Sequence, residues 1–211
     1  MEKTSEIYIS NREENYAEAL KKADEFISAQ NVDRKTSIRL RLIVEETIGM
    51  VRAMAGVFNA KFWLERDDNE FRLCLTGKTD MDKMKKDDLL SISSTGKNAA
   101  AKGFMGKISE IIENGLLNFD DVMKLQQEYV GGQVNYAMIG FGMPEELPMM
   151  GDALTWSLGN YKQGLSGATA QEGGIGEAWD ELEKSIVASI AKDVKVGIKK
   201  DRVDMTILMD I

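Results

Sequence analysis

The most regular apolar pattern in the chain predicts a helix from Asp33 to Gly56. Asp33 or Thr36 is the expected N-cap, because a short side-chain oxygen accepts hydrogen bonds from the free amides of a first turn. Gly56 can adopt the left-handed conformation that ends a helix. Spacings of four, four, four and three define one stripe along this helix: Ile38, Leu42, Glu46, Met50 and Ala53.

Glu46 is the charged member of that stripe. If the stripe is buried, its carboxylate is costly unless something pairs with it, which makes Glu46 a candidate for chemistry. The alternative, which the spacing leaves equally open, is that Glu46 lies at the rim of the stripe and reaches water.

Other elements follow from shorter patterns on both sides of this helix. Alternating runs predict strands, and apolar residues three and four apart predict helices. The strands are expected around Ile7 and over Ala60 to Glu65, Glu70 to Thr76, Val194 to Ile198 and Val203 to Met209, and the helices over Glu14 to Gln30 and Trp179 to Ile190. In the strand over Glu70 to Thr76, Phe71, Leu73 and Leu75 should face the helices.

This element order predicts the α+β class, as a two-layer α/β sandwich with a mixed sheet and the helices on one face. Residues 1–82 and 177–211 would form the sandwich. Residues 83–176, which include both prolines, are expected to form a large helical insertion, with helices near Lys97 to Asn114, Phe119 to Val130 and Asp152 to Tyr161. Trp156 and Tyr161 are interpreted as core anchors rather than as a ligand-stacking pair.

Composition narrows the classes of function. The formal net charge of −8 argues against a nucleic-acid partner or an anionic membrane surface. The absence of histidine excludes that side chain as general base or zinc ligand. The lone Cys74 and the polar first residues favour a cytoplasmic protein, and no apolar run approaches the roughly 20 residues of a membrane span.

The segment LIVEETIGMVRAM resembles the first nucleotide motif of the histidine-kinase-type (GHKL, Bergerat-fold) ATPases, and specifically of the anti-sigma-factor serine kinases. The family helix carries a catalytic Glu, which falls on Glu46, and four residues later a magnesium-binding Asn, which falls on Met50. The C-terminal run VDMT is similar to the family's terminal V-x-M-T, and so implies that Thr206 helps to bind adenine.

The chain departs from the family at three subsites. Met50 offers no hard oxygen ligand, so the magnesium site is expected to be lost and no metal ligand is predicted. The adenine-binding Asp of the family has no aligned counterpart, and Asp80 or Asp82 could substitute only if the strand end bends. Trp179, Glu181 and Glu183 occupy the places of the phosphate-loop glycines, and the two carboxylates would repel a triphosphate. Only Gly174 and Gly176, after a shift, are left to approach a phosphate. ATP is therefore the one cofactor that the resemblance implies, through a degenerate site.

Three hypotheses of function follow from the resemblance, and the least specific of them is a small-molecule sensor with a remodelled nucleotide pocket. The first is a bacterial regulatory protein that binds a protein partner of the sigma-factor or anti-sigma-antagonist kind. The alternative is an ATP-dependent serine/threonine kinase with a rearranged site, in which Glu46 activates the partner's hydroxyl. Under the first hypothesis, the expected partner surface is formed by Met143, Leu147, Met149 and Met150. Alternatively, these residues pack over the vacated nucleotide cleft. The sequence leaves a homodimer open.

Overall fold

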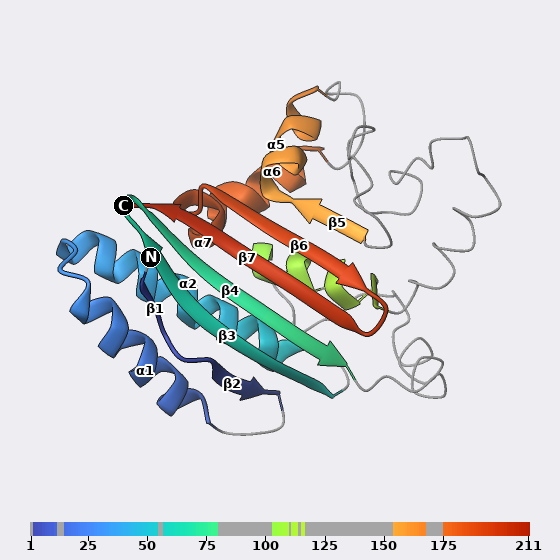
Figure 1. Cartoon of the computed structure of the whole chain (residues 1–211). Coiled ribbons are helices and arrows are strands. Elements are labelled where there is room, and N and C mark those ends of the chain that lie inside the picture. Colours follow the sequence, from blue (N-terminus) through green and yellow to red (C-terminus); the bar gives the residue numbers. More distant parts are fainter. Residues whose placement is uncertain are drawn as a thin grey trace.

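One antiparallel sheet organises the chain. The computed structural model describes residues 2–11, 15–54, 57–79, 103–109, 111–113, 115–116, 154–167 and 175–211. The described strands are β1 (Glu2–Lys3), β2 (Ile7–Ser10), β3 (Phe58–Asp67), β4 (Glu70–Thr79), β5 (Leu154–Ser157), β6 (Asp193–Lys199) and β7 (Arg202–Asp210). They form a seven-stranded sheet in the order β1-β3-β4-β7-β6-β5, with β2 also paired to β3 (Figure 1).

The five predicted strands share this sheet, as expected. The predicted mixed sheet is wrong, however, because every described pair is antiparallel. The physical reason is that β3–β4 and β6–β7 are hairpins with two-residue turns, which can only join antiparallel strands. The two hairpins then meet where β4 pairs antiparallel with β7.

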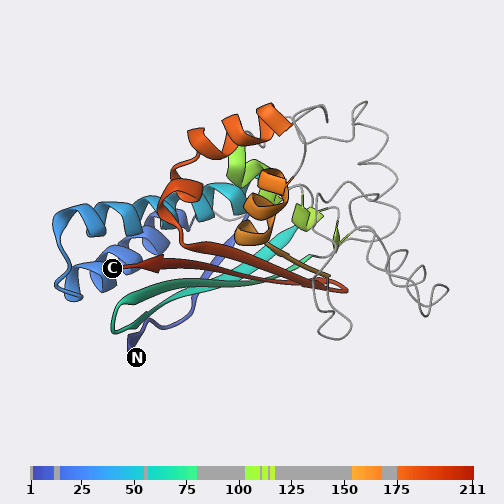
Figure 2. The same ribbon diagram turned by 90° about the horizontal axis from the view of Figure 1, so that it is seen from above.

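The two faces of the sheet differ in cover. The described helices are α1 (Tyr16–Ala29), α2 (Arg34–Ala53), α5 (Leu158–Gly167), α6 (Ile175–Lys184) and α7 (Ile186–Ile190). They lie on one side of the sheet, and none of them covers the other side, which is called the open face below (Figure 2). Burial alternates accordingly: Phe71, Leu73 and Leu75 of β4 are buried under the helices, as predicted, while Arg72 and Cys74 between them are half-buried on the open face.

Helix α2 begins as predicted, with the Asp33 side chain accepting from the amides of Lys35 and Thr36. The predicted buried stripe is wrong. The face that packs on the sheet is formed by Leu40, Ile43, Val44, Thr47, Ile48, Met50 and Val51. Ile38 is 49% exposed and Glu46 is exposed, because each step of four residues turns about 40° past a full helical turn, so a run of such steps spirals away from the sheet.

Residues 83–176 contribute a strand to the sheet as well as helices. The helix predicted over Asp152 to Tyr161 is wrong in its first half, since Leu154–Ser157 forms β5 and pairs with β6, and α5 follows at Leu158. The alternating side chains of this segment explain the strand: Trp156 is 4% exposed against the helical layer, and Thr155 and Ser157 lie half-buried on the other face. The division of the chain into two parts stays a prediction.

The last predicted helix is broken in two. Ser185 interrupts it between α6 and α7, and its side chain accepts from the amide of Ala188, which caps α7. Ile186, which lies within the helix predicted over Trp179 to Ile190, is 44% exposed. None of the helices in the described parts of the chain has the length and apolar character needed to cross a membrane.

Candidate functional site

The resemblance places the family's glutamate and magnesium-ligand positions on α2, the helix that packs on the sheet. Met50, at the position of the family's magnesium ligand, is 3% exposed and belongs to the continuous hydrophobic core. A cavity of about 10 Å³ lies in this interface, lined by Leu40, Ile43, Val44, Leu64, Phe71, Leu73, Ile207 and Met209. Such a cavity is the size of one water molecule, and its apolar lining offers no donor or acceptor side chain to hold one.

The C-terminal end of α2 is covered by the helical residues 103–109. Phe104, Met105 and Ile108 of this segment are buried in the same core. The hydroxyl of Ser109, which has no exposed surface, donates to the sulfur of Met54 at 3.0 Å. Phe104, Met105, Ile108 and Ser109 therefore give this end of α2 apolar and sulfur contacts, and the Asn11 side-chain amide donates to the Met54 carbonyl at 2.8 Å.

The three family positions are not brought together. Glu46 lies on the exposed side of α2, while Met50 faces the sheet. Thr206 lies on β7 between the inward-facing Met205 and Ile207, so its side chain is on the open face. The sheet separates Thr206 from both α2 residues. Thr206 was assigned to adenine binding from the sequence VDMT alone. The alternation of β7 places Val203 and Met205, and not Thr206, toward the helices.

The other predicted ligand residues are dispersed or lie outside the described residues. Gly176 is exposed near the start of α6. Asp80, Gly174 and the predicted partner surface of Met143, Leu147, Met149 and Met150 fall outside the ranges that the structure describes, so these predictions stay open. Within the described ranges, no group of three or more cysteine or carboxylate side chains is placed to hold a metal ion.

Sequence reasoning missed a polar cluster around Lys107. The Lys107 ammonium donates to the Tyr161 hydroxyl at 2.8 Å and lies 3.4 Å from the Glu181 carboxylate. Burial alone would lower the pKa of Lys107, but the hydrogen bond to Tyr161 and the negative charge of Glu181 outweigh it and leave the pKa raised. Lys107 therefore stays charged and ties residues 103–109 to α5 and α6.

Two buried aromatic rings extend this cluster into the core. Trp156 lies 5.9 Å from Tyr161 and 6.3 Å from Phe104, measured between ring centroids. Trp156 and Tyr161 are 4% and 7% exposed, which confirms the interpretation of both as core residues. The indole Nε1 of Trp156 is buried and has no hydrogen-bond partner among the residues that the structure describes.

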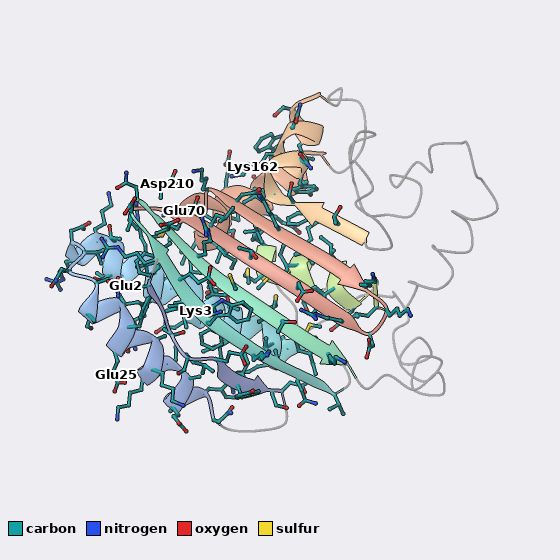
Figure 3. The ribbon with its side chains drawn as sticks, viewed as in Figure 1. Glu2, Lys3, Glu25, Glu70, Lys162 and Asp210 are labelled. Atoms are coloured by element: carbon teal, nitrogen blue, oxygen red, sulfur yellow. The ribbon has the colours of Figure 1, made fainter. Side chains whose placement is uncertain are left out.

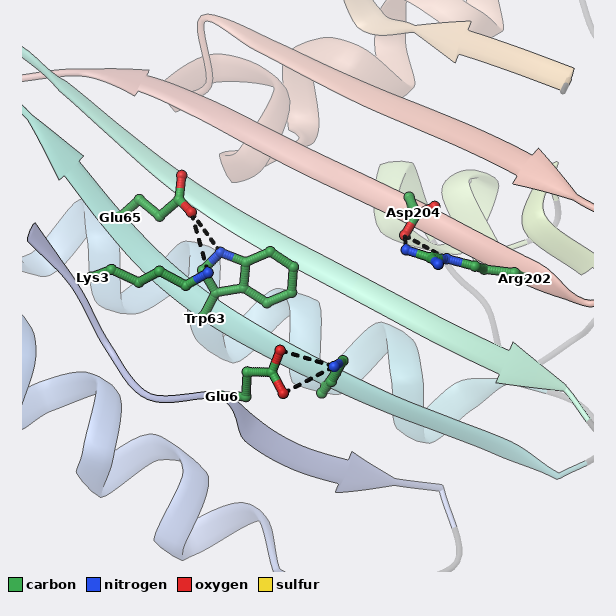
Figure 4. Close-up of polar contacts among 7 residues, drawn as sticks. Lys3, Glu6, Trp63, Glu65, Arg202 and Asp204 are labelled. Carbon is green, nitrogen blue, oxygen red and sulfur yellow. Dashed lines mark hydrogen bonds and ion pairs between the residues drawn. The ribbon is translucent and has the colours of Figure 1, made fainter. Parts of the chain in front are cut away.

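The open face carries a second polar cluster, centred on Trp63 of β3. The indole Nε1 donates to the Glu65 carboxylate at 2.7 Å. The Lys3 ammonium lies 4.3 Å from the centre of the Trp63 ring and 3.6 Å from the same carboxylate (Figure 4). A cation over the ring face and a carboxylate at its edge match the charge distribution of the indole, so the three side chains hold one another in place.

Ion pairs flank this cluster on the same face. Lys61 donates to both carboxylate oxygens of Glu6, at 2.8 and 2.9 Å, and this hydrogen bond lowers the pKa of Glu6. Nearer the β6–β7 turn, Arg202 donates twice to one oxygen of Asp204 (Figure 4). These pairs are solvent-exposed, so each contributes little to stability.

Cys74 lies in the middle of the open face, opposite Trp63 on one side and Thr206 on the other. Burial raises the pKa of its thiol, and the negative charge of Glu65 adds to the rise. The hydrogen bond with Thr206 acts in the opposite direction but is outweighed. A thiol with a raised pKa carries little thiolate at neutral pH, so Cys74 is not an activated nucleophile.

Comparisons with known proteins identified no relative of this chain. No protein-family model matches the chain, and neither the curated proteins nor the solved structures contain a match. The functional assignment therefore depends on the residues themselves and on the resemblance carried by the α2 segment and the β6–β7 hairpin.

The open face was within reach of sequence reasoning. The alternation of β4 already placed Arg72, Cys74 and Thr76 on one side, and the same alternation holds in β3 and β7. No local sequence pattern predicts that β4 pairs with β7, and it is this pairing that aligns their outward residues into rows. The Lys107 cluster joins residues 54 and 74 positions apart, so no spacing pattern pointed to it.

Proposed function

We propose that this chain is a regulatory protein with a histidine-kinase-like ATPase fold that acts by binding a protein partner, as anti-sigma factors do, and that it does not turn over ATP. The fold part of the proposal is supported by the element order: strand, two helices and a hairpin, followed later by two short helices and a second hairpin in the same sheet. The helices lie on one face of that sheet (Figure 2).

One observation carries the functional part: the α2–sheet interface is a packed apolar core. Met50 is buried within it, and the cavity beside Leu40 and Ile43 is only about 10 Å³. A magnesium-bound triphosphate needs hard oxygen ligands and neutralising donors, and a thioether supplies neither. Glu46 points to solvent on the far side of α2, away from this interface.

Calorimetric titration with ATP, with and without magnesium, tests the proposal. We expect no binding heat up to millimolar ATP in either condition, and no phosphate release. Magnesium-dependent turnover that is abolished in Glu46→Gln would instead establish the kinase alternative. A matched control is Glu45→Gln, one residue away on the same helix, where the carboxylate already pairs with Arg41 at 2.8 Å.

The partner half of the proposal has its own test. Wild type and Met149→Glu are compared by capture of purified sigma-factor and anti-sigma-antagonist proteins, together with thermal melting. We expect lost capture with unchanged melting if Met149 is on a binding surface. A melting temperature several degrees lower with unchanged capture would instead assign this patch to packing over the cleft.

A further inference from the structure

The first half of α2 carries a stripe of side chains that faces away from the sheet. Lys35, Ile38 and Leu42 recur at spacings of three and four, opposite the buried face of the same helix. Ile38 is 49% exposed, and Leu42 is half-buried. Arg34 and Arg39 flank this stripe and are exposed. We call Arg34, Lys35, Ile38, Arg39 and Leu42 the outer patch of α2.

The three cations of the outer patch have no ion-pair partner among the described residues. Arg41, on the same helix, differs: its guanidinium lies 2.7 Å from the Asp24 carboxylate and 2.8 Å from that of Glu45. On the neighbouring helix α1, Glu25 pairs with Lys21, and Figure 3 labels this glutamate. These carboxylates are therefore engaged elsewhere, and the positive charge of the outer patch is left uncompensated.

The composition of the outer patch weakens the helix that carries it. The first turn of α2 contains Arg34 and Lys35 and no acidic residue, although the positive end of the helix dipole favours carboxylates there. Lys35 and Arg39 lie one turn apart, so their like charges repel each other. Ile38 is β-branched, which lowers its helix propensity, and its exposed position buries little apolar surface in return. Since folding gains little from these residues, a binding role explains them better.

We propose that the outer patch of α2 binds an acidic amphipathic helix of a partner protein. Carboxylates of that helix would pair with the three unpaired cations, and its apolar residues would cover Ile38 and Leu42. Residues four apart on a helix form a ridge, and such a ridge packs into the groove between the ridges of a second helix. Ile38 and Leu42 have this spacing, so a helix fits the patch better than an extended strand does.

The charges around the outer patch favour a short protein segment over nucleic acid or an anionic membrane. Glu46 lies one turn beyond Leu42, is exposed and has no ion-pair partner among the described residues. It ends the basic stretch after about 12 Å, the rise of the helix from Arg34 to Leu42. The net charge of −8 repels an extended anionic surface, whereas a single acidic helix contacts only the patch.

Fluorescence anisotropy with a synthetic peptide and the full chain tests the proposal. The probe is a labelled peptide of about five helical turns, with leucines three and four residues apart and glutamates on either side of them. We expect a dissociation constant on the order of tens of micromolar at low salt, which rises with salt concentration. The same peptide with lysine in place of each glutamate should bind at least about tenfold more weakly.

Lys35→Glu and Ile38→Gln are the decisive variants, because neither should unfold the chain. Lys35→Glu places a carboxylate in the first turn and one turn before Arg39, so the melting temperature should stay unchanged or rise. Each variant should weaken peptide binding about tenfold. The matched controls are Lys195→Glu on β6 and Ile186→Gln on α7, where the lysine is exposed and the isoleucine is 44% exposed. Both controls should bind the peptide as the wild type does.

Three outcomes overturn the proposal. The first is a wild-type chain that does not bind the peptide at millimolar concentration. The second is equal weakening by Lys35→Glu and Lys195→Glu, which would show attraction between net charges without a defined surface. The third is tighter binding of phosphatidylglycerol vesicles or of a single-stranded DNA oligonucleotide that is lost in Lys35→Glu, which would assign the patch to a membrane or to nucleic acid.

This inference rests on the proposed function in one respect, that the chain acts by binding a protein, but the two fail separately. The peptide titration uses neither ATP nor Met149. Absent peptide binding with retained capture of sigma-factor or anti-sigma-antagonist proteins would contradict only the inference. Peptide binding that is lost in Lys35→Glu, together with magnesium-dependent ATP turnover, would contradict only the proposed function.

Discussion

The two faces of the sheet use the same strands for different purposes. On the covered face, Phe58, Phe62 and Phe71 are at most 1% exposed and join one hydrophobic core with α1, α2 and residues 103–109. On the open face, charged and aromatic side chains form a network of hydrogen bonds and ion pairs, as around Trp63. The strand period of two places an apolar, stabilising surface on one side of the sheet and a polar surface, which none of the described helices covers, on the other.

The difference also bears on where a ligand can act. The resemblance assigns nucleotide contacts both to α2, at Glu46 and Met50, and to β7, at Thr206. Here the covered side holds Met50 in an apolar interface, and the polar groups of the strands, Thr206 among them, are on the open side. These positions therefore do not form one nucleotide site.

The largest expected effect separates two adjacent residues of β3. Phe62→Ala should lower the free energy of unfolding by about 3–5 kcal/mol, because it empties a fully buried site. Trp63→Ala, on the open face, should cost about 1 kcal/mol, since water replaces much of what the ring contacts. Urea unfolding at low protein concentration measures both. Equal losses would show that the two faces do not differ as energetic layers.

A smaller effect is expected at Met50. Met50→Asn restores the family's magnesium ligand by identity, but it places an amide in an apolar interface and should cost about 2–3 kcal/mol. We expect no gain of magnesium-dependent ATP binding in calorimetric titration, because Glu46 and Thr206 lie elsewhere. Met50→Leu, which conserves volume, is the control and should cost under about 1.5 kcal/mol. ATP binding by Met50→Asn would revive the nucleotide hypothesis.

The elements that sequence predicted well are those with a strict local period. The hairpins alternate cleanly, so the inward set of Phe71, Leu73 and Leu75 followed at once, and the short Asp33 side chain gave the α2 cap. The predicted α2 stripe was wrong because residues four apart drift around a helix. Of the two positions left open for Glu46, the one in which its carboxylate reaches water is confirmed. Four equally spaced residues were treated as one face although they span about a third of a turn.

The candidate site was harder to predict than the fold because it depends on long-range pairing. Thr206 was assigned to adenine binding from its neighbouring residues, but the side of the sheet on which it lies is set by the register of β7 against β4 and β6. β5 was missed for a similar reason: four residues carry too short an alternation, and only pairing with β6 makes them a strand. The rows of the open face arise from the same non-local registers.

The smallest expected effect is a pH dependence of the folding stability that arises from Cys74 on the open face. Burial raises the pKa of Cys74, so the folded chain holds the thiol proton more tightly than the unfolded chain does. The resulting stabilisation is complete below the unfolded thiol pKa of about 8.5 and is lost as pH rises through the folded pKa. The loss should stay below about 1 kcal/mol, since the half-buried thiolate remains partly solvated.

Thermal melting of wild type and Cys74→Ala between pH 7 and 9.5 measures this effect below the range in which lysines titrate. The wild-type melting temperature should fall more steeply above pH 8.5 than that of the variant, and the two slopes should agree near neutrality. Cys74→Ser, which keeps a hydroxyl beside Thr206 but cannot ionise in this range, should follow Cys74→Ala in slope. Parallel curves for all three chains would mean that the thiol is as well hydrated in the folded state as in the unfolded one, and the open face would then be wetter around Cys74 than its half-buried position implies.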